Sequence, residues 1–340
     1  MKKIDFENHF YLRELIDYLG TRSELPKFNK ETNSVQLREG LAAPYGKSWN
    51  YGGSMLDDIC DFSEERLKRL DEAGIDVAIL SSSPGIEELP EKEAIYFAKK
   101  SNDVVAALTK KYPGRFLGSA TLPTKYVDAS IKELERCIKE LGFVFWHTHS
   151  NYRDEHLYDE KYLPLLAKAE ELNCPFYIHP SFSDDPDLKG YGFNYPGAGL
   201  GFGQDTMRTS LRLILNGIFD MFPRLRMILG HLGEYYPFVL DRMDNRFAVV
   251  KEPEYNKLKH SIKYYFENRN VMLTTSGNMS PDALRCTLNV IGADGILFAT
   301  DYPYEPYHDI IDFLNLQDLT DEEREKLYYK NAEKYIFAKH

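Results

Sequence analysis

The stretch SIKELERCIKELGFVFWHTH (130–149) joins a helical pattern to a strand pattern and decides the fold class. Its first part, residues 130–142, spaces apolar residues three or four positions apart and ends at Gly142, as helices commonly do. Its second part, residues 143–149, is a short apolar run of the kind that forms a buried strand. Together they make one helix–strand unit, and the same alternation continues along most of the chain.

Short apolar runs alternate with helical patterns through nearly all of the 340 residues. The runs are 4–10, 76–83, 115–123, 143–149, 175–181, 226–233, 271–277 and 295–303. Strand–helix alternation predicts a parallel sheet, and eight units favour an α/β fold of the (β/α)8 TIM-barrel type with loop insertions. A doubly wound sheet is the weaker alternative, because it needs a Gly-rich phosphate-binding turn and no GxGxxG sequence follows these runs.

Two segments carry the length beyond an ordinary barrel. Residues 18–60 are polar and contain Gly and Pro, and residues 184–203 are rich in Gly and aromatics. Each follows a strand, so we expect both to lie over the C-terminal mouth as lids or substrate walls. No linker or repeat divides the chain, so we expect one domain over residues 1–340.

Charge, hydropathy and cysteine spacing limit the partners and the location. A net charge of −11 without a basic stripe argues against nucleic acid or an anionic membrane as partner. No apolar run approaches the roughly 20 residues that span a bilayer, and the N-terminus lacks the apolar core of a signal peptide. The four cysteines form no CxxC pair, which suits a reducing compartment. We therefore expect a soluble, cytoplasmic protein.

The first run, IDFENHF (4–10), sets a carboxylate and an imidazole into an apolar alternation. Alternate residues of a regular strand share a face: Ile4, Phe6, Asn8 and Phe10 on one side, Asp5, Glu7 and His9 on the other. These seven residues leave two interpretations open. One is an exposed edge strand with a wet polar face. The other is a metal or catalytic site, because buried charges need partners.

Polar residues recur at the C-terminal ends of the predicted strands, where barrel enzymes hold their chemistry. They are Glu7, His9, His147, His149, His179, His231, Glu234, Thr274, Thr275, Ser276 and Asp301. Taken singly, each has an ordinary explanation, such as a core histidine, a capping Asp301 or a first-turn Glu234. Their convergence on one rim favours a shared metal site.

Two carboxylates and two imidazoles form the predicted metal site: Glu7, His9, His179 and Asp301. This set neutralises one divalent ion, Zn²⁺ or Mn²⁺, and leaves coordination positions for substrate. His231 with Glu234 is typical of an imidazole that a carboxylate orients toward a substrate.

These motifs resemble the metal-dependent decarboxylases of the amidohydrolase superfamily (the amidohydrolase-2 group), which act on 2,6- and 2,3-dihydroxybenzoate, salicylate-type acids and 5-carboxyvanillate. The segments that carry the resemblance are IDFENHF (4–10), YIHPS (177–181), the run 210–247, LTTSGNMS (273–280) and LFATDYPYE (297–305). The resemblance implies a homodimer or homotetramer with a small aromatic acid as substrate.

The resemblance also implies a role for individual residues. It makes Glu7, His9, His179 and Asp301 the metal ligands, and His231 and Glu234 the pair that contacts substrate. It makes Arg242 a residue that binds substrate or reaches across a subunit contact; a surface arginine beside Asp241 and Asp244 is the alternative. The fourth-strand histidine of the family falls on His147, although FWHTHSN departs from the family's Asn-Ser-His-Thr and adds His149.

The activity implied is non-oxidative decarboxylation of a hydroxylated aromatic carboxylic acid. The metal chelates the carboxylate and an ortho oxygen, and Asp301 protonates the ring carbon as CO₂ leaves. We expect a raised proton affinity of Asp301 for this role. The resemblance also argues against a two-metal hydrolase, because hydrolytic relatives commonly open with His-x-His and bridge two metals through a lysine at the fourth strand. This chain opens with Glu-x-His, and FVFWHTH contains no lysine. A mononuclear hydrolase or hydratase acting on a lactone, amide or ring-cleavage product is the alternative, and a metal used only for folding is a further one.

Overall fold

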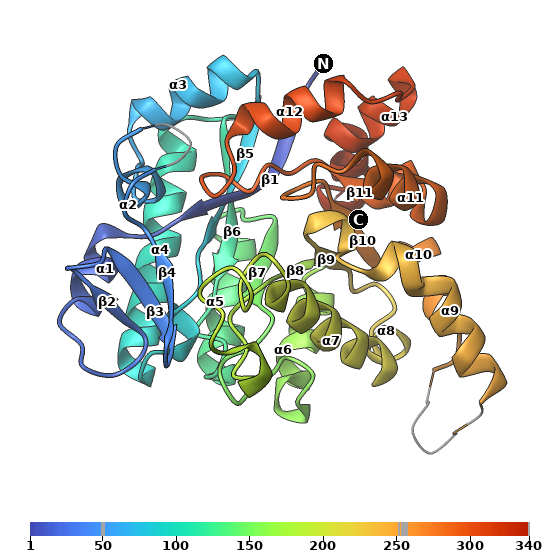
Figure 1. Cartoon of the computed structure of the whole chain (residues 1–340), viewed down its shortest axis with the longest axis horizontal. Coiled ribbons are helices and arrows are strands. Elements are labelled where there is room, and N and C mark those ends of the chain that lie inside the picture. Colours follow the sequence, from blue (N-terminus) through green and yellow to red (C-terminus); the bar gives the residue numbers. More distant parts are fainter. Residues whose placement is uncertain (49–51, 251, 253–257, 339–340) are drawn as a thin grey trace.

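Eight parallel strands form a nearly closed barrel in the computed structural model, which describes all residues except 49–51, 251, 253–257 and 339–340 (Figure 1). The strands are β1 (Ile4–Phe10), β5 (Val77–Ser82), β6 (Phe116–Thr121), β7 (Phe145–His149), β8 (Phe176–His179), β9 (Met227–Leu229), β10 (Val271–Thr274) and β11 (Ile296–Leu297). They pair in that order, and each lies within a predicted run. The predicted TIM-type barrel is therefore confirmed.

The barrel closes between β1 and residues 298–305, which we call the closing segment. Its backbone hydrogen bonds are Phe6 N to Phe298 O (3.0 Å), Asp301 N to Glu7 O (3.1 Å) and His9 N to Tyr302 O (2.6 Å). These bonds place Glu7, His9 and Asp301 side by side, although nearly 300 positions separate them along the chain.

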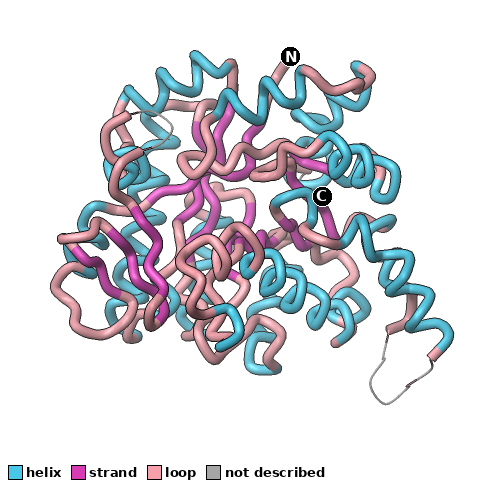
Figure 2. The backbone as a smooth tube through the Cα atoms, viewed as in Figure 1, coloured by secondary structure: helices cyan, strands magenta, loops and turns pink. Residues whose placement is uncertain are grey.

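Helices surround the barrel between successive strands (Figure 2). They are α1 (Arg13–Leu19), α2 (Met55–Ile59), α3 (Glu64–Ala73), α4 (Glu91–Lys111), α5 (Val127–Lys139), α6 (Leu163–Glu171), α7 (Gly201–Leu215), α8 (Ile218–Met221), α9 (Tyr236–Val249), α10 (Ile262–Glu267), α11 (Pro281–Ile291), α12 (Tyr307–Asn315) and α13 (Asp321–Glu325). The stretch 130–149 forms most of α5 and all of β7. No helix in the described part of the chain combines the length and apolar character needed to cross a membrane.

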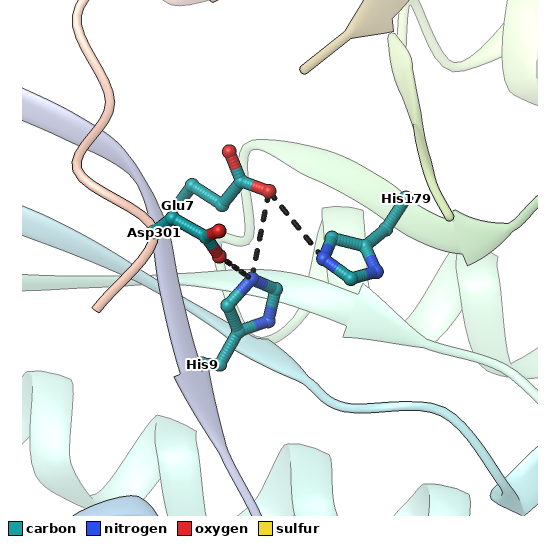
Figure 3. Close-up of side chains that lie close together, drawn as sticks. All are labelled: Glu7, His9, His179 and Asp301. Carbon is teal, nitrogen blue, oxygen red and sulfur yellow. Dashed lines mark ion pairs between the residues drawn. The ribbon is translucent and has the colours of Figure 1, made fainter. Parts of the chain in front are cut away.

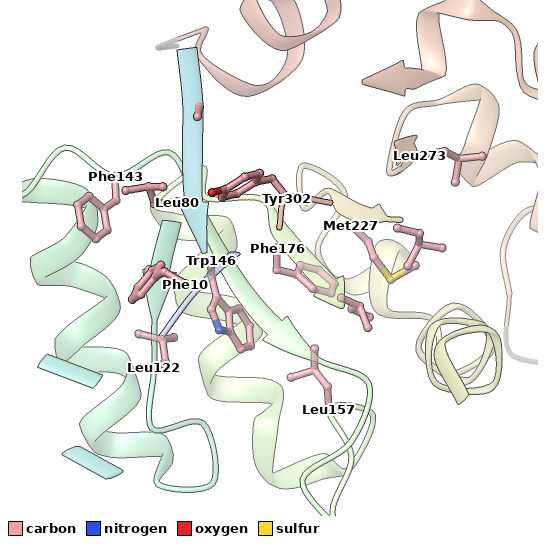
Figure 4. Close-up of a cluster of buried hydrophobic side chains, with 14 of the residues drawn as sticks. Phe10, Leu80, Leu122, Phe143, Trp146, Leu157, Phe176, Met227, Leu273 and Tyr302 are labelled. Atoms are coloured by element: carbon pink, nitrogen blue, oxygen red, sulfur yellow. The ribbon is translucent and has the colours of Figure 1, made fainter. Parts of the chain in front are cut away.

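Side chains of the strands alternate between two apolar cores, as the pleat requires. One core fills the barrel interior and includes Ile79 of β5 and Phe145 of β7. The other lies between strands and helices and includes the neighbouring Leu80 and Trp146 (Figure 4). His147 and His149 lie two and four positions after Phe145 in β7. Their side chains therefore also face the barrel interior.

The first insertion contains a small antiparallel sheet, which we call the inserted sheet: β2 (Lys27–Asn29), β3 (Ser34–Arg38) and β4 (Leu41–Pro44). The sequence interpretation of residues 18–60 predicted no strands there. The alternation in SVQLR (34–38) is the signal that could have found β3, since Val35 and Leu37 are buried.

Candidate metal centre and active site

A bulge in β1 interrupts the regular alternation of its side chains between the barrel interior and the outer side of the strand. Its register against β5 shifts between Asp5 and Asn8, so strict alternation fails. Phe6 packs inside the barrel, and the next residue, Glu7, joins His9 at the interior mouth. The predicted common face of Asp5, Glu7 and His9 is therefore wrong. The exposed-edge interpretation is also wrong, because all seven residues of β1 are buried.

Two other polar residues of β1, Asp5 and Asn8, hold the closing segment in place. Asp5 accepts hydrogen bonds from the Thr300 amide (2.9 Å) and hydroxyl (2.6 Å), and Asn8 accepts one from Tyr307 (2.6 Å). Burial raises the pKa of Asp5 to about 7, although the Thr300 hydrogen bonds oppose the shift. These contacts fix the backbone next to Asp301.

The structure brings Glu7, His9, His179 and Asp301 together, and we call them the four-residue cluster (Figure 3). One nitrogen or oxygen of each lies within 4.8 Å of those of the others. His9 Nε2 is 3.0 Å from Asp301 Oδ1 and 3.5 Å from Glu7 Oε1. His179 Nε2 is 3.5 Å from the same Glu7 oxygen. Two imidazole nitrogens and two carboxylate oxygens therefore converge on one buried point.

The hydrogen bonding of the cluster fits a divalent cation. Glu7 Oε1, His9 Nε2 and Asp301 Oδ1 are buried and, apart from the close contacts they make with one another, have no hydrogen-bond partner among the described residues. Outward atoms of Glu7 and His179 are held: Tyr177 donates to Glu7 Oε2 at 2.6 Å, and His179 Nδ1 lies 2.8 Å from the Pro180 carbonyl. These two residues show the pattern of metal ligands, in which an outer contact orients the group and leaves one atom free for the ion, whereas His9 Nδ1 has no hydrogen-bond partner among the described residues.

The cluster shifts the proton affinities of His9 and Asp301 in opposite directions. Burial lowers the pKa of His9, but the carboxylates of Asp301 and Glu7 outweigh it and raise the value to about 9. Burial raises the pKa of Asp301, but His231 and His9 outweigh it and leave it below its usual value. The expected raised proton affinity of Asp301 is therefore wrong for the metal-free site, because two imidazoles favour its anion.

His231 and Glu234 form an oriented pair beside the cluster. His231 Nδ1 is 2.6 Å from Glu234 Oε1, and its Nε2 is 3.8 Å from Asp301 Oδ2. Burial lowers the pKa of His231, but the charge of Glu234 and the contact with Asp301 raise it well above its usual value. The pair can therefore hold a proton next to Asp301.

Unusual backbone conformations hold these side chains. His231, Glu234 and Asp301 have φ angles of 53°, 56° and 69°, in the left-handed region that costs about 1–3 kcal/mol for a residue other than glycine. Gly277 (φ 61°) packs against His231, and a Cβ there would lie 2.6 Å from His231 Cδ2. Such local strain concentrates at functional sites.

The two histidines of β7 lie at different depths in the barrel. Register with β8 places His149 beside His179 and His147 beside Tyr177. His149 Nδ1 is 2.6 Å from Glu87 Oε1, and both groups are buried. The His147 ring stacks on Tyr177, with 5.4 Å between centroids, and burial lowers its pKa well below the usual value. Sequence reasoning missed the partners Glu87 and Tyr177.

Arg242 does not join the other predicted residues. It is exposed on α9 and is not among the residues that line the cavity of its own chain. The predicted residues Thr274 and Ser276 do lie beside the site. Their hydroxyl oxygens are 2.9 Å apart, and Ser276 Oγ accepts a hydrogen bond from the His231 amide (3.2 Å).

A cavity of about 530 Å³ opens above the cluster. His179, His231, Glu234 and Asp301 line its inner end. The inserted sheet contributes Val35, Leu37, Ala43 and Pro44, and the segment 184–203 with its flanks contributes Phe182, Phe193, Asn194, Ala198 and Phe202. Both insertions thus form walls of the cavity, and most of these wall residues are apolar.

Comparison with known proteins identifies the relatives of this chain. The amidohydrolase family profile matches residues 4–336. A gamma-resorcylate decarboxylase from Rhizobium sp. (strain MTP-10005) is 36% identical over 294 residues, covering 83% of this chain and 89% of the relative. The structure of 5-carboxyvanillate decarboxylase from Sphingomonas paucimobilis is similar, with a TM-score of 0.86, 26% identity and 99% of each chain covered.

A second similar structure contains a metal. It is the dihydroxybenzoic acid decarboxylase from Polaromonas sp. JS666 with bound manganese and the inhibitor 2-nitroresorcinol, with a TM-score of 0.80 and 30% identity. The match covers 98% of this chain and 96% of that chain. The profile match over nearly the whole chain, the sequence identity and the shared barrel show that this protein belongs to the amidohydrolase family.

Proposed function

We propose that this protein is a metal-dependent, non-oxidative decarboxylase of a hydroxylated aromatic carboxylic acid. The observation that carries the proposal is the four-residue cluster, whose two imidazole nitrogens and two carboxylate oxygens converge at the inner end of a largely apolar cavity. The reported relatives support it, because each is named as a decarboxylase of an aromatic acid.

In this proposal Glu7, His9, His179 and Asp301 would hold one divalent ion, either Mn²⁺ or Zn²⁺. The bound ion supplies Lewis-acid polarisation of the substrate carboxylate and its ortho oxygen, and fixes their orientation. Bound manganese in the Polaromonas relative makes Mn²⁺ the first metal to test. Mixed nitrogen and oxygen ligands suit both ions.

The geometry around Asp301 indicates the route by which a proton reaches the substrate. His231, held by Glu234, carries a proton at Nε2, which is 3.8 Å from Asp301 Oδ2. Asp301 takes that proton from His231 and delivers it to the ring carbon that bears the carboxylate. The bond to the carboxylate then breaks, its electron pair restores the aromatic ring, and CO₂ leaves. His231 is thus a proton reservoir and Asp301 is the group that touches the reacting carbon.

The walls of the cavity suit decarboxylation better than hydrolysis. Apolar residues of the inserted sheet and of the segment 184–203 line the cavity and would limit the access of water to the four-residue cluster. At the fourth strand, β7 presents His147 and His149 and carries no lysine that could bridge a second metal. A mononuclear hydrolase or hydratase remains the alternative function, and its product distinguishes it.

We also propose that residues 1–340 act as one domain in a cytoplasmic homodimer or homotetramer. Helix α9 projects from the barrel in Figure 1, and on it Phe238 is 88% exposed, one turn from Arg242. A subunit contact there would cover Phe238. It would also allow Arg242 to reach the cavity of a neighbouring subunit.

The test is CO₂ release from aromatic acids that carry an ortho hydroxyl. The acids are 2,6- and 2,3-dihydroxybenzoate, salicylate and 5-carboxyvanillate, each with Mn²⁺-loaded, Zn²⁺-loaded and metal-free protein. We expect release that requires the metal and is lost in Asp301→Asn at unchanged metal content. Substantial turnover by metal-loaded Asp301→Asn would refute the role of Asp301. Hydrolysis of lactones or amides without CO₂ release would refute decarboxylation.

A further inference from the structure

We infer that Arg66 is a positioning residue, which holds the metal ligand His9 in place through the His9 backbone. The inference deepens the proposed function and rests on it, since it assumes that the four-residue cluster binds a divalent ion. It also accounts for a difference between His9 and two other members of the cluster, Glu7 and His179.

The imidazole of His9 has no outer hydrogen bond. Glu7 and His179 each keep an outer atom in such a bond, but His9 Nδ1 is buried without a hydrogen-bond partner among the described residues. The rings of His179 and Tyr304 pack against it, with centroids 4.5 Å and 5.2 Å away. The position of this ligand therefore depends on ring packing and on where its own backbone lies.

Arg66 fixes that backbone from helix α3. Its side chain is fully buried, and its Nη2 donates to the His9 carbonyl at 2.7 Å and to the Asn8 side-chain oxygen at 3.3 Å. Its Nη1 donates to the Asp61 carbonyl at 3.2 Å. The His9 amide in turn donates to the Tyr302 carbonyl at 2.6 Å. Both backbone polar groups of His9 are thus held.

The burial of this guanidinium is costly and indicates a function. In the described part of the chain no carboxylate lies within ion-pair distance of Arg66, and its buried Nε has no hydrogen-bond partner. The Tyr302 ring, whose centroid is 4.8 Å from the guanidinium carbon, offsets part of the cost through a cation–π contact. A well-packed apolar side chain often serves stability at least as well as a buried charge, and such departures from stable packing concentrate at functional sites.

The first test is the Mn²⁺ affinity of the full chain, measured by titration against a competing chelator. Arg66→Lys keeps the charge but offers one nitrogen, so it cannot reproduce the fixed fork that reaches the His9 and Asp61 carbonyls. We expect Arg66→Lys to weaken Mn²⁺ binding by about 10-fold and Arg66→Met by about 10- to 100-fold, the range for contacts that orient metal ligands. If Arg66→Met does not fold, Arg66→Lys decides the test.

Arg269→Lys is the matched control. Arg269 also donates to two backbone carbonyls, those of Phe266 (2.9 Å) and Ile291 (3.1 Å), and it does not line the cavity. This control should bind Mn²⁺ like the unmodified protein. The electron paramagnetic resonance spectrum of bound Mn²⁺ at saturation should change in Arg66→Lys and stay the same in Arg269→Lys, because ligand geometry determines the spectrum.

A double-mutant cycle separates the positioning of His9 from a general loosening of the site. In a His9→Ala background, Arg66→Lys should change Mn²⁺ affinity by less than about twofold, because no imidazole is left to position. In a His179→Ala background, the loss should remain about 10-fold. Equal losses in the two backgrounds would show a general structural role and would overturn the inference.

Two further outcomes are distinct from each other. If Arg66→Lys binds Mn²⁺ within about twofold of the unmodified protein and gives the same spectrum, the inference is overturned and the proposed function stands. If the unmodified protein binds neither Mn²⁺ nor Zn²⁺, the proposed function is refuted, and the inference falls with it.

Discussion

Replacing Tyr177 with phenylalanine tests how the cluster is held. The Tyr177 hydroxyl donates to Glu7 Oε2 at 2.6 Å, and both side chains are fully buried. A hydrogen bond to a charged group contributes about 1.5–3 kcal/mol, which corresponds to about 10- to 150-fold in affinity at about 1.4 kcal/mol per decade. Contacts of this kind around metal ligands are worth about 10–100-fold. We therefore expect Tyr177→Phe to weaken Mn²⁺ binding by about 10- to 100-fold.

The assay is Mn²⁺ titration against a competing chelator. Tyr236→Phe is the matched control, because Tyr236 is equally buried but its hydroxyl lies 3.0 Å from Ser210 and outside the cluster. The control should bind Mn²⁺ like the unmodified protein. If Tyr177→Phe binds Mn²⁺ within twofold of the unmodified protein, Glu7 Oε2 needs no donor, and the argument for an oriented carboxylate ligand fails.

Three further predictions concern the proton reservoir and a buried ion pair. Glu234→Gln should lower kcat by about 100-fold at unchanged metal content, because His231 loses its charged partner; kinetics with metal analysis checks this. Arg38→Met should lower the free energy of unfolding by about 3–5 kcal/mol, measured in urea, because buried Glu88 loses its partner at 2.7 Å and keeps only Arg153 at 3.6 Å. Burial raises the pKa of Glu88 above 4.5 although Arg38 opposes it, so the folded chain keeps a proton that the unfolded chain releases. Stability should then fall as pH rises from 4.5 through the folded pKa, and Glu88→Gln should flatten that slope in urea titrations at several pH values.

Periodicity was enough to predict the barrel but not the geometry of β1. The eight runs and their order follow from apolar patterns, which are local. The bulge between Asp5 and Asn8 arises because Asp5 binds Thr300 and Asn8 binds Tyr307. Those partners lie almost 300 positions away, so no window around residues 4–10 contains them.

The candidate site also has a part that could be predicted from the sequence and a part that could not. Its inward residues could be predicted because parallel strands bring their C-terminal ends to one rim. Tyr177 and Glu87 were missed because each acts through a contact between distant segments, one with Glu7 and the other with His149. The low proton affinity of Asp301 was missed for a related reason: it depends on how closely His9 and His231 approach.

The central claim is that the ring carbon loses CO₂ and gains a proton. Its most direct test is NMR of the reaction of carboxyl-¹³C-labelled 2,6-dihydroxybenzoate with Mn²⁺-loaded protein in D₂O. The account predicts labelled CO₂ or bicarbonate and resorcinol that carries one deuterium at the carbon that held the carboxylate, with neither formed by metal-free protein. Label that stays in the organic product, or turnover that is equal without metal, would contradict it.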